Sequence, residues 1–106
     1  RVFFDFDRST IRKDGAETLA RQSAWLGQFP DMGVTINGHC DKRGSTNYNL
    51  ALGERRAHAA MEQLVAMGVN PARIKIVSFG KNRPIVEQDG SEWAYQQNRV
   101  AITVLD

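Results

Sequence analysis

The stretch GHCDKRGSTNYNLALGERRA, residues 38–57, joins a short apolar run to a long helical pattern. The run before it, Met32 to Gly38, alternates apolar and polar residues as a half-buried strand does. The segment from about Thr46 to Met67 has helical spacing, and Gly68 stands where helices commonly end in glycine. This part of the sequence therefore predicts a strand, a polar loop and a long helix in succession.

The rest of the chain continues this alternation of strands and helices. We expect further strands at Arg1–Phe6, Ile74–Phe79 and Val100–Leu105, a helix from Asp14 to about Gln28, and a short helix from Ser91 to Gln97. Strands that alternate in polarity, rather than being apolar throughout, favour a sheet covered by helices on one face only. The pattern therefore predicts an α/β two-layer arrangement.

The first helix has a start signal and a buried stripe that can be read from the sequence. Asp14 with Glu17 three residues later has the pattern of an acidic N-cap and capping box. Leu19, Leu26 and Phe29 mark the face that we expect to be buried.

Composition sets broad limits on what the chain can do. Its 106 residues suit one domain, with 42% apolar and 25% charged residues. The formal net charge of +2 provides no large basic field for nucleic acid. The single cysteine, Cys40, cannot form an internal disulfide. No run approaches the roughly 20 apolar residues of a membrane-spanning helix, and the opening run RVFFDF suggests a domain cut from a longer chain.

The long helix separates a sheet-facing side from a solvent side when residues are placed about 100° apart. The predicted sheet-facing side holds Leu50, Gly53, Ala57, Ala60, Met61 and Leu64. The small residues among them should let the helix sit close to the sheet. The predicted solvent side holds Glu54, Arg55, His58 and Glu62.

Arg56 falls on the margin between those two sides. Asn49, Leu52 and Arg56 are spaced i, i+3, i+7 and form one ridge. The ridge has two interpretations at this point: it is the wall of a cleft, or Arg56 is an arginine that extends its head group to water beside an incidental surface leucine. If one arginine of the pair 55–56 carries function, the geometry favours Arg56.

Metal binding and catalysis fit the sequence poorly. His39, Cys40, Asp41 and His58 have the right chemistry for zinc. However, adjacent strand residues point to opposite faces, so His39 and Cys40 do not converge. A Cys–His nucleophile would also need a third, orienting group that is not evident. We therefore expect no metal, no cofactor and no enzyme.

Nucleic-acid binding is an alternative from another class. Lys42, Arg43, Arg55 and Arg56 cluster, and Phe3, Phe4 and Phe6 lie on the first strand as stacking residues do. Acidic residues interleave with both groups, which would repel phosphates. A steep loss of affinity with salt would identify a phosphate binder.

A cleft that holds both signs of charge fits better. Asp7 ends the first predicted strand, and Asp41 and Arg43 follow the second. If these two strands are neighbours, their carboxyl ends meet the ridge that carries Arg56. A carboxylate can pair with an ammonium and an arginine with a carboxylate, so the matching ligand is zwitterionic. The sequence leaves open that Asp41 and Arg56 pair only with each other.

Four segments carry a resemblance to a known family. They are FFDFD (3–7), GHCDKRGSTNYNLALGERRA (38–57), VSFGKNRP (77–84) and YQQNR (95–99). Together they resemble the OmpA-like peptidoglycan-binding domain over nearly the whole chain. Within that family, the motifs FDFD and GERRA are most similar to those of the peptidoglycan-associated lipoproteins of the Tol–Pal system. Such a domain is an α/β (α+β) sandwich: a mixed four-stranded sheet with helices on one face.

The resemblance implies a binding domain for the diaminopimelate residue of the peptidoglycan stem peptide. By the matching positions, Asp41 takes the ligand's ammonium and Arg56 takes its carboxylate. The remaining positions implied to line the pocket are Phe6, Asp7, Arg43, Asn49 and Leu52. One departure stands out, because the family usually has a second arginine after Asn98-Arg99 and this chain has Val100.

The resemblance also implies a cellular setting. It implies a lipid anchor and tether upstream, a place at the periplasmic face of the outer membrane of a Gram-negative bacterium, and a role in envelope integrity and cell division. It implies a partner, the propeller protein TolB, that competes for an overlapping surface. A peptidoglycan-anchoring domain of an OmpA-type porin or of a motor stator is the alternative within the same fold.

Overall fold

The computed structural model describes residues 1–106 as four strands, three helices and one short 3₁₀ turn. Their bounds are β1 Val2–Phe3, α1 Lys13–Gln28, β2 Val34–His39, α2 Thr46–Ala66, the 3₁₀ turn Pro71–Arg73, β3 Ile74–Gly80, α3 Glu92–Asn98 and β4 Val100–Leu105. Every predicted element exists, and most bounds agree within one or two residues. None of the three helices combines the length and the apolar character needed to cross a bilayer.

The four strands form one mixed sheet in the order β1-β4-β2-β3. Strands β2 and β3 are parallel, because α2 connects them as a crossover, whereas β4 runs antiparallel to both β1 and β2. The assumption that the first two strands are neighbours is therefore wrong, since β4 lies between them. The carboxyl end of β1 reaches the end of β2 by another route, described below.

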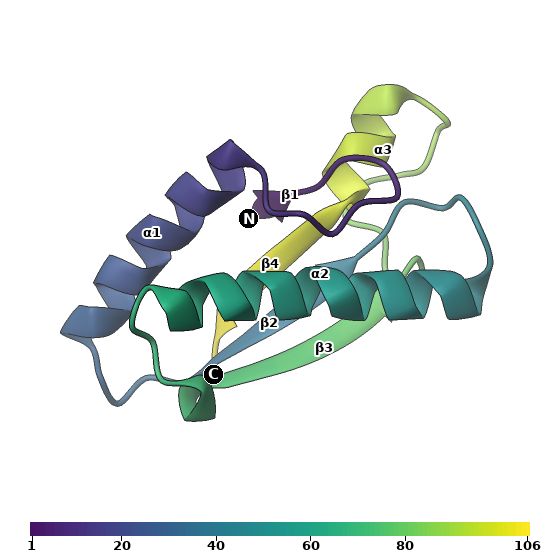
Figure 1. Ribbon diagram of the computed structural model, residues 1–106. Coiled ribbons are helices and arrows are strands. Elements are labelled where there is room, and N and C mark those ends of the chain that lie inside the picture. Colours follow the sequence, from purple (N-terminus) through teal and green to yellow (C-terminus); the bar gives the residue numbers. More distant parts are fainter.

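Helices α1 and α2 cover the same face of the sheet, as Figure 1 shows. The core between these layers is one apolar cluster, and it includes the predicted α2 residues Ala57, Ala60 and Leu64. On the opposite side of α2, the residues predicted to face solvent, Glu54, Arg55, His58 and Glu62, are exposed. The prediction of a mixed four-stranded sheet with helices on one face is confirmed.

Three details of the N-terminal third differ from the prediction. Strand β1 has two residues instead of six, because the chain leaves the sheet after Phe3. Helix α1 starts from Arg12 without a side-chain cap, and the Asp14 carboxylate accepts a backbone hydrogen bond only from Gly15, its neighbour. Phe29 is 46% exposed, since it lies past the last helical turn and stacks on Trp25 instead of entering the core.

Helix α2 lies against β2 at a contact between two glycines. A Cβ atom on Gly38 would lie 1.9 Å from the carbonyl oxygen of Gly53, and one on Gly53 would lie 2.4 Å from Ser78 Oγ. The predicted close approach of α2 to the sheet is therefore confirmed, and it depends on the missing side chains. This contact fixes the distance from the sheet of Arg56, three residues further along α2.

Replacing Gly38 with alanine should destabilise the protein strongly. The new methyl group would meet a backbone oxygen that cannot turn away, and overpacking of this kind costs about 1–3 kcal/mol or more. The control is Gly27→Ala in α1, where nothing lies within 4 Å of the new Cβ and helix propensity improves by about 0.5–1 kcal/mol. Urea denaturation measures both, and equal stability of the two variants would contradict the close contact.

Candidate functional site

A pocket of about 230 Å³ opens between the loop that follows β1, the loop that follows β2 and the first half of α2. All seven residues that the sequence singled out lie in its wall. The lining consists of Phe6, Asp7, Cys40, Asp41, Arg43, Gly44, Tyr48, Asn49, Leu52 and Arg56. The segments that supply them lie at the end of the sheet where α3 also sits, to the upper right in Figure 1.

Arg56 joins two segments of the pocket wall that the sheet itself keeps apart. The residue is 1% exposed, and its guanidinium group donates to three backbone carbonyl oxygens. Nε donates to Arg8 at 2.8 Å and Nη2 to Asp5 at 3.2 Å, both in the loop after β1. Nη1 donates to His39 at 3.0 Å, at the end of β2. Arg56 thereby brings the loop after β1 across to the end of β2, although the two strands are not neighbours.

Arg56 carries a buried charge that no carboxylate neutralises. None of the chain's ion pairs includes it, so it does not pair with Asp41. Burial lowers the pKa of Arg56, although the nearby charge of Asp41 acts in the opposite direction. After the three carbonyl contacts, each terminal nitrogen keeps one further N–H. A buried and unpaired cation with free donors at a pocket wall favours an anionic ligand group such as a carboxylate.

Both interpretations that competed with a cleft are wrong. Arg56 does not extend its head group to water, because it is almost fully buried. It does not form an exclusive pair with Asp41, because Asp41 pairs with other arginines. Leu52, which the helix geometry placed beside Arg56, is 4% exposed and lines the same pocket.

Asp41 is buried and already occupied by two arginines. Its Oδ1 accepts from the backbone N–H of Arg43 at 3.0 Å and from Arg43 Nε at 3.1 Å. Its Oδ2 accepts from Arg43 Nη2 at 2.7 Å and from Arg99 Nη1 at 3.4 Å. Burial alone would raise the pKa of Asp41, but the hydrogen bonds from Arg43 and Arg99 outweigh it and lower the pKa below its usual value. Asp41 is therefore ionised at neutral pH.

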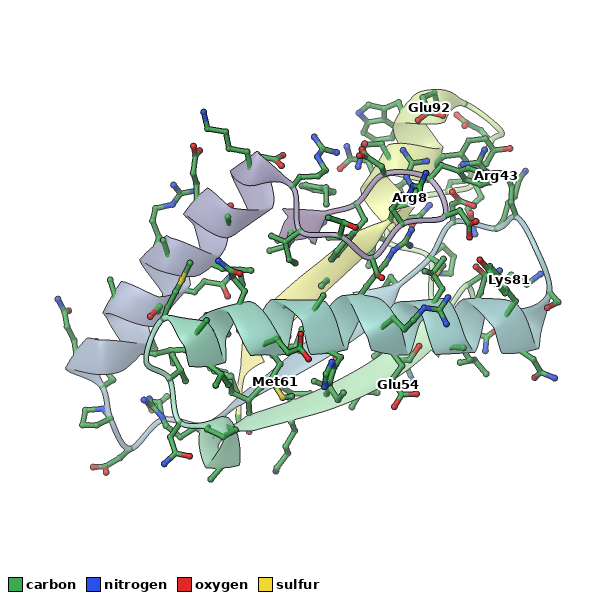
Figure 2. All side chains as sticks on the ribbon, viewed as in Figure 1. Arg8, Arg43, Glu54, Met61, Lys81 and Glu92 are labelled. Carbon is green, nitrogen blue, oxygen red and sulfur yellow. The ribbon has the colours of Figure 1, made fainter.

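Arg43 lies between two aromatic rings as well as on Asp41. Its guanidinium carbon is 4.0 Å from the centre of the Phe6 ring and 3.9 Å from that of Tyr95. Figure 2 shows Arg43 beside the loop that carries Arg8 and below α3, the helix that bears Glu92. The Arg43 side chain nevertheless keeps 34% of its surface exposed, so Arg43 covers Asp41 on the side that faces solvent.

A second carboxylate, that of Asp7, lies at the outer part of the pocket. Asp7 has a positive φ of 56°, which turns the chain at this point of the loop. Its only side-chain hydrogen bond comes from the Tyr48 hydroxyl, which donates to Oδ1. Phe6 beside it is 56% exposed. The outer part of the pocket is therefore an exposed carboxylate flanked by two aromatic rings.

The remaining lining residues shape the pocket rather than carry charge. Asn49 Nδ2 donates to the carbonyl oxygens of Arg43 and Ser45, which holds the loop after β2 on the start of α2. The Cys40 thiol donates to the Asn49 carbonyl, and burial raises the pKa of this thiol to about 11. Cys40 is thus a protonated thiol that fills space in the pocket wall. The ring of His39 lies elsewhere, stacked on Phe79.

Sequence reasoning did not assign Cys40, Gly44 or Tyr48 to the pocket, and it did not find the contact of Arg99 with Asp41. Tyr48 lines the pocket, and its i, i+4 spacing to Leu52 was a signal that could have found it. Arg99 binds Asp41 from 58 positions away, and no local spacing links the two. Only the pairing of β2 with β4, in which Gly38 lies opposite Ala101, brings the two side chains together.

These contacts make the pocket suited to a small group that carries both charges. A carboxylate can pair with the free N–H groups of Arg56, and an ammonium can pair with Asp7 or with Asp41. The site holds three arginines, Arg43, Arg56 and Arg99, against Asp7 and Asp41. Because Arg99 also pairs with Glu92, the charges around the site are balanced, which suits a ligand that carries both signs of charge.

Comparisons with known proteins place the chain in a family. Its sequence is 51% identical to the peptidoglycan-associated lipoprotein of Mesorhizobium japonicum over 99% of this chain and 62% of the relative. It is 50% identical to the same-named protein of Rhizobium meliloti over 99% of this chain and 59% of the relative. The chain thus spans about three fifths of the length of these relatives.

Solved structures agree. The peptidoglycan-associated lipoprotein of Burkholderia pseudomallei matches with a TM-score of 0.94 and 35% identity, covering 99% of this chain and 88% of that one. The C-terminal domain of Helicobacter pylori MotB matches with a TM-score of 0.90 at 22% identity, over 99% of this chain and 81% of that one, which shows a shared fold. Residues 3–99 match the model of the OmpA family, and we conclude that this chain belongs to that family.

Proposed function

We propose that this chain binds peptidoglycan non-covalently, through the diaminopimelate residue of the stem peptide. The observation that carries the proposal is the buried Arg56, which has no carboxylate partner and lines a pocket shared with Asp7 and Asp41. The far end of diaminopimelate carries a carboxylate and an ammonium on one carbon, so one small pocket can receive both. The names of the relatives, peptidoglycan-associated lipoproteins, support this ligand.

In the proposed complex, the ligand carboxylate pairs with Arg56 and the ammonium with Asp41. An ionised carboxylate has about four lone-pair positions, and all of those on Asp41 are in use. The ammonium therefore has to take a position from an arginine. Arg43 is the one that can yield, because its side chain is 34% exposed while that of Arg99 is 4% exposed.

We also propose the setting that the family resemblance implies. The whole protein is a lipid-anchored component of the outer membrane, faces the periplasm and tethers the envelope to the cell wall within the Tol–Pal system. Its protein partner there is TolB. A binding role without catalysis fits the pocket, since its one thiol stays protonated.

The alternatives have weaker support. The relative from Mesorhizobium japonicum, which shares 51% of its aligned residues with this chain, is named a lipoprotein. The stator protein MotB shares 22% sequence identity, and this similarity extends to the fold alone. For nucleic-acid binding, the aromatic residues of the first segment would have to be accessible. Phe4 is instead fully buried in the core, and the exposed Phe6 has the guanidinium group of Arg43 over its ring.

Co-sedimentation with purified peptidoglycan sacculi tests the proposal. We expect the protein in the pellet at 50 mM and at 200 mM salt, because salt screens a pair of desolvated charges far less than it screens charges on an exposed surface. A phosphate binder with several contacts would lose roughly 10³-fold or more in affinity over this range. A protein that stays in the supernatant at both salt concentrations would refute the proposal.

A further inference from the structure

The two arginines on Asp41 are held in very different ways. Arg43 comes from the loop after β2, two residues along the chain, and keeps a third of its side chain in water. Arg99 comes from the junction of α3 and β4 and is almost fully buried. The two contacts therefore differ in how easily they can be broken.

Arg99 is fixed by partners other than Asp41. Its Nε donates to the carbonyl oxygen of Phe4 at 2.9 Å, at the point where the chain leaves β1. Its Nη2 donates to Glu92 at 2.9 Å and to Gln96 at 3.3 Å, both on α3. Because these three acceptors lie on two separate segments, they fix the position of the guanidinium group. The remaining terminal nitrogen of Arg99, Nη1, donates to Asp41 Oδ2 at 3.4 Å.

We propose that Arg99 is a positioning residue of the pocket, which keeps the Asp41 carboxylate ionised and aimed at the ligand when Arg43 turns aside. This inference rests on the proposed function. Arg99 itself is not part of the pocket lining, so it acts on the ligand only through Asp41. Without it, Asp41 would be a buried carboxylate whose only charged partner is the one that ligand binding displaces.

The electrostatics agree with this division of roles. A buried carboxylate without a fixed cation tends to take up a proton, because burial disfavours its charged form. Arg99 is among the groups that hold the pKa of Asp41 below its usual value. A protonated Asp41 would have no charge with which to attract an ammonium, and one that has turned away could not contact it.

The test compares Arg99→Met with Arg12→Met. Arg12 also donates to Gln96 and lies near the same loop, but it does not contact Asp41. We measure binding of a stem tripeptide containing diaminopimelate by calorimetry, and the Asp41 pKa by NMR of its carboxyl carbon. For Arg99→Met we expect about tenfold weaker binding and a raised Asp41 pKa. For Arg12→Met we expect neither change.

A double-mutant cycle separates positioning from general structural support. In an Asp41→Asn background, Arg99→Met should weaken binding no further, since the residue through which it acts is already gone. A similar loss in both backgrounds would overturn the inference. So would Arg99→Met protein that binds as the unaltered protein does while Asp41→Asn has lost binding. If Asp41→Asn itself binds the tripeptide normally, this inference fails and Asp7 is left as the carboxylate that receives the ammonium. Failure of the unaltered protein to bind the tripeptide would instead refute the proposed function.

Arg99→Lys is a second variant that tests the role of Arg99, and it can be used if Arg99→Met does not fold. A single ammonium can approach Asp41 but cannot reach Phe4 and Glu92 as well. The Asp41 pKa should therefore stay closer to that of the unaltered protein than in Arg99→Met, with a smaller loss of affinity. A lysine variant with a fully raised Asp41 pKa, or with unchanged affinity and an unchanged pKa, would contradict the proposed role.

Discussion

Replacing Arg56 with alanine should abolish sedimentation with sacculi and destabilise the fold at the same time. Binding should weaken by roughly 2–5 kcal/mol, because the ligand carboxylate loses its buried partner. Three carbonyl oxygens, of Asp5, Arg8 and His39, would also lose their donor, which should lower the free energy of unfolding by roughly 2–5 kcal/mol. Urea denaturation and sedimentation measure the two effects separately.

Two other arginines serve as controls for Arg56. Arg73 also donates to three carbonyl oxygens, those of Leu26, Phe29 and Met32, but it lies away from the pocket. Arg73→Ala should therefore reduce stability and leave binding of the folded protein intact. Arg55→Ala should leave binding nearly normal, because Arg55 is exposed on the other side of α2. Equal loss of binding at Arg55 and Arg56 would contradict the helix geometry.

The expected loss of stability follows from the contacts of Arg56, and helical periodicity alone does not indicate it. Helical periodicity places Arg56 at the margin of the core, which was enough to choose it over Arg55. It says nothing of the groups that the guanidinium meets, because Asp5 and Arg8 are about fifty residues away in the chain. The same arginine therefore anchors the pocket wall and offers its remaining donors to a ligand.

Replacing Asp41 with asparagine should weaken binding strongly while the pocket keeps its shape. Asparagine fills the same volume but has no charge for an ammonium, so we expect a loss of roughly 2–5 kcal/mol in calorimetric titration with the stem tripeptide. Asp31→Asn, at an exposed position outside the pocket, should bind as the unaltered protein does. Undiminished affinity of the Asp41 variant would leave Asp7 as the carboxylate that receives the ammonium.

The same variant should also change how stability depends on pH. Since the pKa of Asp41 is below the usual 3.8 in the folded protein, its ionised form stabilises the fold. That contribution is fully present above pH 3.8 and is lost as the pH falls through the lower, folded-state pKa. The stability difference between the unaltered protein and Asp41→Asn should therefore be largest near neutral pH and shrink in acid. A difference that does not vary with pH would contradict the lowered pKa.

Local sequence patterns predicted the helices and strands well, but they predicted poorly the strand order and the contacts between residues distant in the chain. Strand alternation and helix spacing gave α2 and β4 almost to the residue, because each signal lies within a few turns of chain. The insertion of β4 between β1 and β2 left no such signal, since the order of strands is decided by packing across the whole chain. For the same reason, Asp41 could be selected from its loop, but its partner Arg99 could not.

In the first segment, Asp7 lines the same pocket as Asp41 although the assumption that placed it there is wrong. Asp7 was placed near Asp41 on the assumption that their strands are neighbours, and β4 separates those strands. The two acids nevertheless line one pocket, because the chain leaves the sheet after Phe3 and Arg56 draws its loop across. The segment FFDFD thus contributes a buried Phe4 and an exposed Phe6 from one short loop.

The most direct measurement is a calorimetric comparison of two stem tripeptides that differ only in their third residue. One carries meso-diaminopimelate, and the other carries lysine, which keeps the ammonium but lacks the adjoining carboxylate. We predict measurable binding of the first and at least roughly 30-fold weaker binding of the second, since only the first has a carboxylate on the carbon that bears the side-chain ammonium, where it can pair with Arg56. Equal affinity for the two peptides would show that the buried charge of Arg56 does not select the ligand, and the account would be wrong.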